Sequence, residues 1–245
     1  VGDGSLVGEV VFAATKDTPK AEAVVSVSNV DVASLHPLLP PDFDHSVSGT
    51  LQGVATASLR DEKVSLQAQV SVAEPEFDNY GASTASGELV WCEDELEVPW
   101  AMAEAPDGRV VLAGRFNSEG LKARFSASDL DLQALGQRFS QEDLVGRGWA
   151  TGTVAGTYED PVADVELAAW DVAYQDYAVE ALYAEGQGGP KSVQVNRLMA
   201  YRDGAVATFA GRVSDLNSRE PYGKISGPFR VAGLTVPQVL DWAKY

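Results

Sequence analysis

Cysteine and histidine are scarce in this sequence, and their scarcity removes several kinds of chemistry. Cys92 is the single cysteine among 245 residues, so the chain can form no internal disulfide and no thiolate metal cluster. The two histidines, His36 and His45, lie near Asp42 and Asp44 in a proline-rich stretch, but their spacing matches no usual zinc pattern. We therefore expect neither a metal nor another cofactor.

Basic residues are also few, with 18 Lys and Arg against 36 Asp and Glu, for a net charge of −18. Proteins that bind nucleic acid concentrate Lys and Arg to neutralise phosphates, so nucleic acid is not an expected partner. Electrostatic docking on an anionic membrane surface is disfavoured for the same reason. We interpret the dispersed acidic residues as a means of keeping the chain soluble.

Long apolar runs are absent. No stretch approaches the roughly 18 apolar residues of a membrane-spanning helix, and residues 109–114 are typical of the short runs present. The chain begins with Val1 and has no signal-peptide pattern. Since the chain starts and ends in mid-pattern, we expect a segment of a longer protein whose anchor lies elsewhere.

Catalytic motifs are missing as well. There is no Gly-x-Ser-x-Gly elbow, and the glycines of residues 148–156 lack the Lys-Ser/Thr ending of a phosphate-binding loop. Acidic neighbours such as Glu74 and Glu76, or Glu93 to Glu95, are more typical of exposed turns than of catalytic pairs. Cys92 has no basic neighbour that would activate it. We expect that the protein is not an enzyme.

What the sequence does contain is alternation of apolar and polar residues, which predicts β-strands. Residues 64–72 are the clearest case, and residues 96–100 follow the same pattern, with Pro99 indicating a sheet edge or strand end. Turn-forming residues separate the runs at 60–63, 106–108, 117–120 and 202–204. Further strands are expected at 122–132, 152–158, 165–167, 172–182, 193–195 and 205–213. The predicted fold is an all-β antiparallel meander.

The alternating pattern also repeats. Residues 28–35 (SNVDVASL) return 100 residues later at 128–135 (SDLDLQAL), and a third copy occupies 233–240. Residues 77–80 recur at 174–177, and the Ala-Gly-Arg of 113–115 recurs at 210–212. A short helix is expected at each unit start, at 32–39, 132–144 and 236–244. We predict the end of a preceding repeat (1–24), two β repeat units (25–121 and 122–218) and the start of a third (219–245).

One part of the chain resembles a known family. In residues 146–161 (GRGWATGTVAGTYEDP), Gly148, Gly152, Val154, Gly156 and Pro161 match a glycine-punctuated hairpin. The residues that precede it match a helix-start motif through Leu130, Leu132 and Leu135. Together they resemble the repeats of the TamB/AsmA-like envelope proteins of diderm bacteria, the translocation and assembly module. Residues 26–244 follow the pattern, although Ala57 and Glu62 depart from it in the first unit.

The resemblance implies a curled β-sheet, folded like an open taco, whose apolar inner face shields lipid acyl chains during transport between the inner and outer membranes. It also implies a periplasmic location within a longer, inner-membrane-anchored protein, and assistance in outer-membrane protein assembly through a BamA-type partner. Phospholipid or another acyl lipid, and further repeats of the same chain, are the other expected partners. The residues expected to line the groove are Val64, Leu66, Val70, Val72, Val154, Val165 and Leu167.

Two alternatives remain open. The same alternation is typical of an ordinary sealed core, and an extracellular adhesin or stalk module that binds glycan or protein would have one. The aromatic residues that could stack on sugars are Trp149, Trp170, Tyr174, Tyr177 and Tyr183. We interpret them first as sheet-packing residues.

Overall fold

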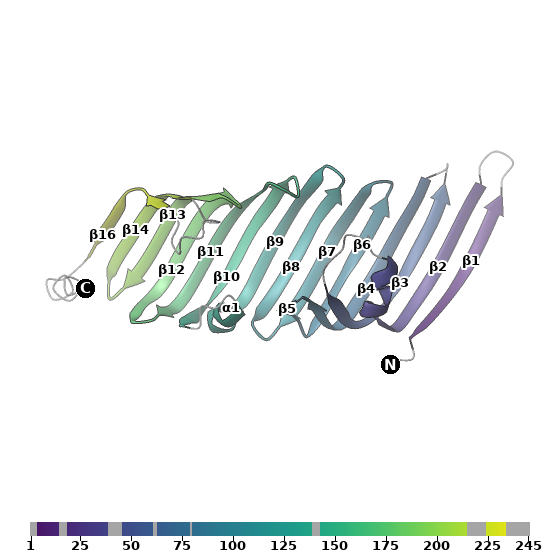
Figure 1. Ribbon diagram of the computed structural model, residues 1–245, viewed down its shortest axis with the longest axis horizontal. Coiled ribbons are helices and arrows are strands. Elements are labelled where there is room, and N and C mark those ends of the chain that lie inside the picture. The colour runs from purple at the N-terminus through teal and green to yellow at the C-terminus, as the bar shows by residue number, and fades with distance from the viewer. Residues whose placement is uncertain are drawn as a thin grey trace. The chain divides into compact units, whose positions relative to one another are not determined.

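The segments in which apolar and polar residues alternate fold into long antiparallel strands that follow one another in chain order (Figure 1). The structure is a computed structural model that describes residues 4–14, 19–38, 46–60, 63–78, 80–138, 143–214 and 224–233. It divides into two compact units, Val1–Ala123 and Arg124–Tyr245. The described strands form one open antiparallel sheet by their hydrogen-bonding order, which confirms the predicted all-β class.

The first unit is a meander in which each long strand pairs with the next long strand, and the short β5 pairs only with the end of β4. Its strands are β1 (Ser5–Ala14), β2 (Pro19–Asp31), β3 (Val47–Arg60), β4 (Lys63–Phe77), β5 (Tyr80–Gly81), β6 (Thr84–Cys92), β7 (Glu95–Ala105) and β8 (Gly108–Asn117). β9 (Gly120–Asp131) then carries the chain into the second unit.

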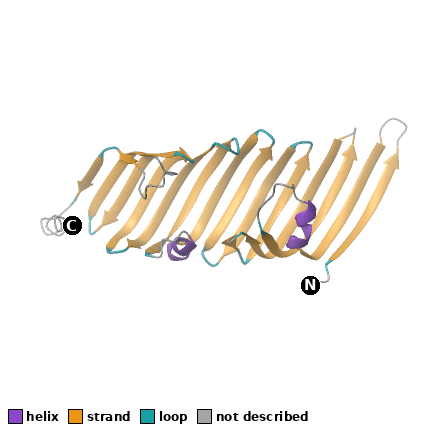
Figure 2. Cartoon of the chain, in the orientation of Figure 1, coloured by secondary structure: helices purple, strands orange, loops and turns teal. Residues whose placement is uncertain are grey.

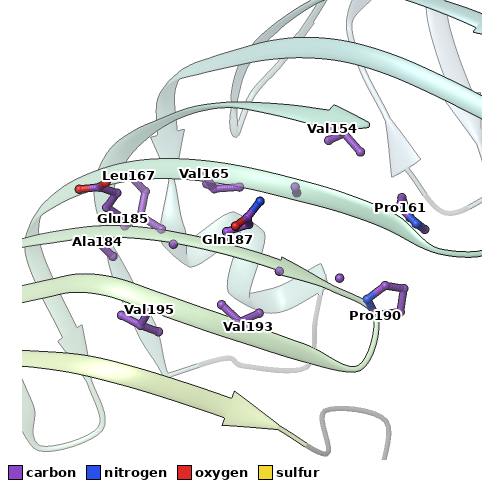
Figure 3. A pocket seen from close by; sticks show the side chains of 14 residues that line it. Val154, Pro161, Val165, Leu167, Ala184, Glu185, Gln187, Pro190, Val193 and Val195 are labelled. Atoms are coloured by element: carbon purple, nitrogen blue, oxygen red, sulfur yellow. The ribbon is translucent and has the colours of Figure 1, made fainter. Parts of the chain in front are cut away.

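The second unit continues the meander through long strands and ends with two short ones, β15 and β16, which both pair with β14. Its strands are β10 (Leu144–Gly156), β11 (Pro161–Tyr174), β12 (Tyr177–Gly189), β13 (Ser192–Arg202), β14 (Ala205–Ser214), β15 (Lys224–Ser226) and β16 (Phe229–Ala232). The strands bend along their length (Figure 3), as the predicted curl requires.

Two short helices interrupt the strands, as expected (Figure 2). The 3-10 helix η1 (Val32–Leu38) packs against β3, and α1 (Leu132–Arg138) packs against β10. Both helices start in the same way. The aspartate that precedes each helix, Asp31 or Asp131, accepts a hydrogen bond from a backbone N–H of the first turn. Asp31 Oδ1 accepts from Ala33 N at 3.0 Å, and Asp131 Oδ1 accepts from Gln133 N at 2.9 Å.

The helix predicted for 132–144 is wrong in extent, since α1 ends at Arg138 and Leu144 begins β10. The apolar spacing that suggested a longer helix therefore belongs in part to a strand. The third predicted helix, at 236–244, lies outside the described residues.

The backbone irregularities of the two units recur at matching positions. The pairing of β3 with β4 shifts between Ser48 and Thr50, and that of β10 with β11 shifts 97 residues later, between Val145 and Arg147. The shifts in β6–β7 and β7–β8 likewise return in β12–β13 and β13–β14. Left-handed φ values occur in four equivalent pairs, which are Asn29 and Asp129, Gly49 and Gly146, Glu74 and Asp171, and Asp78 and Gln175. The predicted repeat bounds themselves stay a prediction.

Two strand predictions need correction. Pro99 does not mark an edge, because β7 lies between β6 and β8; it sits where the β7–β8 ladder skips between Val98 and Ala101. A bulge tolerates a residue without an N–H, so the fold accommodates Pro99 inside the sheet. The strand predicted for 172–182 is in fact the end of β11, a turn that includes the left-handed Gln175, and the start of β12.

The bulge glycines generate a stability prediction. Gly146 has φ +136°, and a Cβ there would meet Trp170 O, Asp171 O and the Cα of Val172, each at 3.1 Å. We expect Gly146→Ala to lower the free energy of unfolding by about 1–3 kcal/mol, because alanine is strained at positive φ and has no free space. Urea unfolding monitored by circular dichroism measures the change.

Gly81→Ala is the matched control, since the nearest atom to its added Cβ, Pro75 O, is 3.9 Å away. We expect this variant to unfold within about 0.5 kcal/mol of the wild type. Equal urea midpoints for the two variants would contradict the role assigned to the bulge.

Candidate functional site

One face of the second unit is apolar across its strands. The pairing places Gly152 beside Val165, Val165 beside Gly186, and Gly186 beside Val195. Directly paired residues of antiparallel strands share a face, and so do residues two apart along a strand. The members of this apolar face in the second unit are Ala150, Gly152, Val154, Ala163, Val165, Leu167, Ala169, Leu182, Ala184, Gly186, Gly188, Val193, Val195, Leu198, Phe209 and Val213.

The first unit has the same apolar face. Ala57 pairs with Leu66, Leu66 with Trp91, and Trp91 with Leu96. The members of this face in the first unit are Leu51, Ala55, Ala57, Leu59, Val64, Leu66, Ala68, Val70, Val72, Ala85, Leu89, Trp91, Leu96, Val98, Ala101, Leu112 and Phe116.

No second layer seals either face within the described residues. The hydrophobic residues that are buried there are small, namely five alanines and Val98, and no large side chain is fully buried. Leu66 is 37% exposed, Trp91 40% and Val64 46%, although all three belong to the apolar face. A sheet sandwiched by another layer buries such side chains. The apolar face is therefore reachable from outside in each unit.

In the second unit this face contains a hollow of about 420 Å³ (Figure 3). Val154, Val165, Val193 and Val195 surround it, and the bare backbone of Gly186 and Gly188 leaves room between them. Glu185 and Gln187 also line it. The volume falls within the range of about 300–1,000 Å³ usual for small-molecule sites.

All seven predicted lining residues lie on these apolar faces. Val64, Leu66, Val70 and Val72 share the face of the first unit, and Val154, Val165 and Leu167 line the hollow of the second.

Sequence reasoning missed residues that define the hollow. The alternation of Val193 and Val195 could have identified them, since it puts both on one face. Gly186 and Gly188 alternate in the same way, yet a glycine gives no apolar signal, so the space they create has no signature in a hydrophobic pattern.

The opposite face is polar, and its groups pair with one another. Tyr183 Oη donates a hydrogen bond to Glu166 Oε1 at 3.0 Å, and Arg197 lies over the Tyr183 ring, 5.9 Å from its centroid. The hydrogen bond to the Glu166 carboxylate is the main cause that raises the pKa of the Tyr183 phenol.

Members of the acidic clusters noted in the sequence form ion pairs or lie at a strand bulge. Lys63 Nζ lies 2.7 Å from Glu93 Oε1, and this contact raises the pKa of Lys63. Glu95 lies 3.9 Å from Arg115, and Glu74 occupies a left-handed bulge position. These groups are exposed, and such pairs contribute little stability.

Among the described residues, no three His, Cys, Asp or Glu side chains come together as a metal site. The side chains of His36, Asp42, Asp44 and His45 lie outside the described part. The described helices include none with the length and apolar character that a membrane span requires.

In comparisons with known proteins, no family model, no curated protein and no solved structure matches the chain.

Two valines of β11 allow a direct test of the open apolar face. Val165 lines the hollow, whereas Val162 is 40% exposed on the polar face of the same strand. We expect the protein to bind the neutral apolar dye Nile red, and Val165→Asp to weaken that binding about fivefold through lost apolar contact. Val162→Asp is expected to change it less than about twofold. Fluorescence titration measures both, and equal losses would contradict a binding face.

The Tyr183–Glu166 hydrogen bond gives a pH-dependent prediction. Replacing Glu166 with Gln removes the carboxylate that stabilises the neutral phenol, so the pKa of Tyr183 should fall toward its ordinary value. In the wild type, the stabilisation is present at neutral pH and is lost as the pH rises through the raised pKa. Phenolate absorbance, titrated in the wild type and in Glu166→Gln, measures the shift. Glu76→Gln, distant in sequence and in the first unit, serves as the control and should leave the curve unchanged.

Proposed function

We propose that this chain is a non-enzymatic segment of an envelope protein whose apolar β-face shields lipid acyl chains. The observation that carries the proposal is an extended apolar face in each unit that no second layer covers within the described residues. Soluble proteins rarely leave large contiguous apolar surfaces exposed unless something binds them. An acyl chain is the ligand that fits an apolar surface without needing specific polar partners.

The energetics are sufficient for such a ligand. At about 25 cal/mol per Å², an acyl chain that buries a few hundred Å² gains several kcal/mol. The hollow between β10 and β13 provides this contact through valines and leucine. Because the attraction is not directional, a chain can slide from one apolar patch to the next without breaking a specific bond.

The resemblance to the TamB/AsmA-like repeats supports a setting for this activity. It favours transport of phospholipid or another acyl lipid between the inner and outer membranes by a longer, inner-membrane-anchored periplasmic protein. In that setting further repeats of the chain extend the apolar face. Assistance in outer-membrane protein assembly with a BamA-type partner is the related role, since unfolded β-strands also expose apolar side chains.

Photo-crosslinking tests the proposal directly. A photo-reactive amino acid at Leu66 or Leu167 should capture phospholipid when the protein is expressed in a diderm bacterium, because both positions lie on the apolar face. The matched positions Gln67 and Ala168 are their chain neighbours on the polar face and should capture little. Mass spectrometry of the adducts identifies what is bound.

Other outcomes separate the alternatives. Protein adducts in place of lipid at Leu66 and Leu167 would favour the assembly role. Equal lipid capture at apolar and polar positions, or none at any position, would contradict the proposal. A lipid-free protein that binds only sugars would favour an adhesin or stalk module.

A further inference from the structure

The polar face of the second unit carries four aromatic side chains that the alternation does not require. They lie in two cross-strand rows. In one, Trp149 pairs with Ala168, which pairs with Tyr183. In the other, Trp170 pairs with Ala181, which pairs with Tyr201. Each row thus places two rings on either side of an alanine.

The first unit shows that the fold does not need these rings. Its backbone has the same bulges 97 residues earlier, and its polar rows have the same pairings. The residues equivalent to Trp149, Trp170, Tyr183 and Tyr201 are Gln52, Ala73, Ser86 and Glu104. The first unit has the same strand pairing but holds polar or small residues at the four equivalent positions. The aromatic rings of the second unit therefore need an explanation other than packing.

Polar groups and a second hollow adjoin the rings. The cross-strand row next to that of Trp149 and Tyr183 on the same face contains Thr151, Glu166, Glu185 and Arg197. A hollow of about 360 Å³ opens on this face, lined by Arg124, Thr151, Asp164, Glu166, Glu185 and Asn196. Tyr183 is held to this row by its hydrogen bond to Glu166 and by the Arg197 guanidinium over its ring.

We propose that this polar face binds a neutral carbohydrate chain, at a site distinct from the apolar face. Pyranose rings present apolar C–H faces that stack on aromatic rings, and hydroxyl groups that both donate and accept hydrogen bonds. The small Ala168 separates the rings of Trp149 and Tyr183. The carboxylates of the hollow accept hydrogen bonds from sugar hydroxyl groups, and Arg124 and Asn196 donate hydrogen bonds to them. Three carboxylates in the hollow disfavour anionic ligands such as nucleic acid.

The experiment titrates the protein with maltohexaose, cellohexaose and chitohexaose, three neutral oligosaccharides of different linkage and substitution. We expect at least one to change the tryptophan fluorescence saturably and to receive saturation transfer from the protein in NMR. The proposal is overturned if none of the three binds at concentrations up to about 10 mM, the range of very weak specific binding.

The first unit has Gln52 and Ser86 at the positions equivalent to Trp149 and Tyr183, so these residue types are compatible with the fold at those positions. Trp149→Gln and Tyr183→Ser install those residues, and together they should weaken oligosaccharide binding about tenfold or more. Trp100→Arg is the matched control, because Trp100 lies on the polar face of the first unit, is 41% exposed and has Arg197 as its equivalent. The oligosaccharide affinity of Trp100→Arg should equal that of the wild type.

Nile red binding separates this site from the apolar face. The double variant should keep wild-type dye binding, because its substitutions lie on the opposite face of the sheet. Unchanged oligosaccharide affinity in the double variant, or an equal loss in Trp100→Arg, would contradict the proposed site. If the double variant does not fold, Glu166→Gln tests the same site through the polar row, with an expected loss of binding.

Discussion

Strand-to-strand hydrogen bonding is the constraint on which each unit depends. Since no second layer covers the apolar face in the part of the chain that the structure describes, the backbone ladder and the side-chain pairs along it must hold the strands together. This explains why the bulges matter. They recur at equivalent positions in both units, where they change the local twist and let strands as long as 15 residues bend. A bulge also makes room for Pro99 inside the sheet.

The same ladder separates two kinds of surface. Because successive side chains point to opposite faces, each strand contributes apolar groups to one face and polar groups to the other. On the apolar face, equivalent positions of the two units hold apolar residues or glycine, as an unspecific acyl-binding surface would. On the polar face they differ: Trp149 and Tyr183 of the second unit stand where the first has Gln52 and Ser86. The two units thus share their strand pairing and bulges, while the polar face of the second unit has aromatic residues that the first unit lacks.

Much of the fold was predictable because a period of two is a strong signal. The alternation in residues 64–72 placed Val64, Leu66, Val70 and Val72 on one face, and the pairing of β4 confirms that placement. Prediction from the hydrophobic pattern failed where the local backbone conformation determines the structure. The turn at Gln175 and the early end of α1 depend on local conformation, not on hydrophobicity. The hollow escaped prediction because the bare backbone of Gly186 creates it, and the aromatic rows became visible only once the register was known.

An open apolar face leaves its side chains accessible to reagents in solution, and cysteine labelling measures that accessibility. In a Cys92→Ser background, Leu66→Cys and Gln67→Cys place one thiol on each face of β4. If the face is open, a maleimide should modify the two thiols at rates within about tenfold of each other, because Leu66 is 37% exposed. A thiol at position 66 that reacts only at the rate of global unfolding would show that the apolar face is sealed and not open.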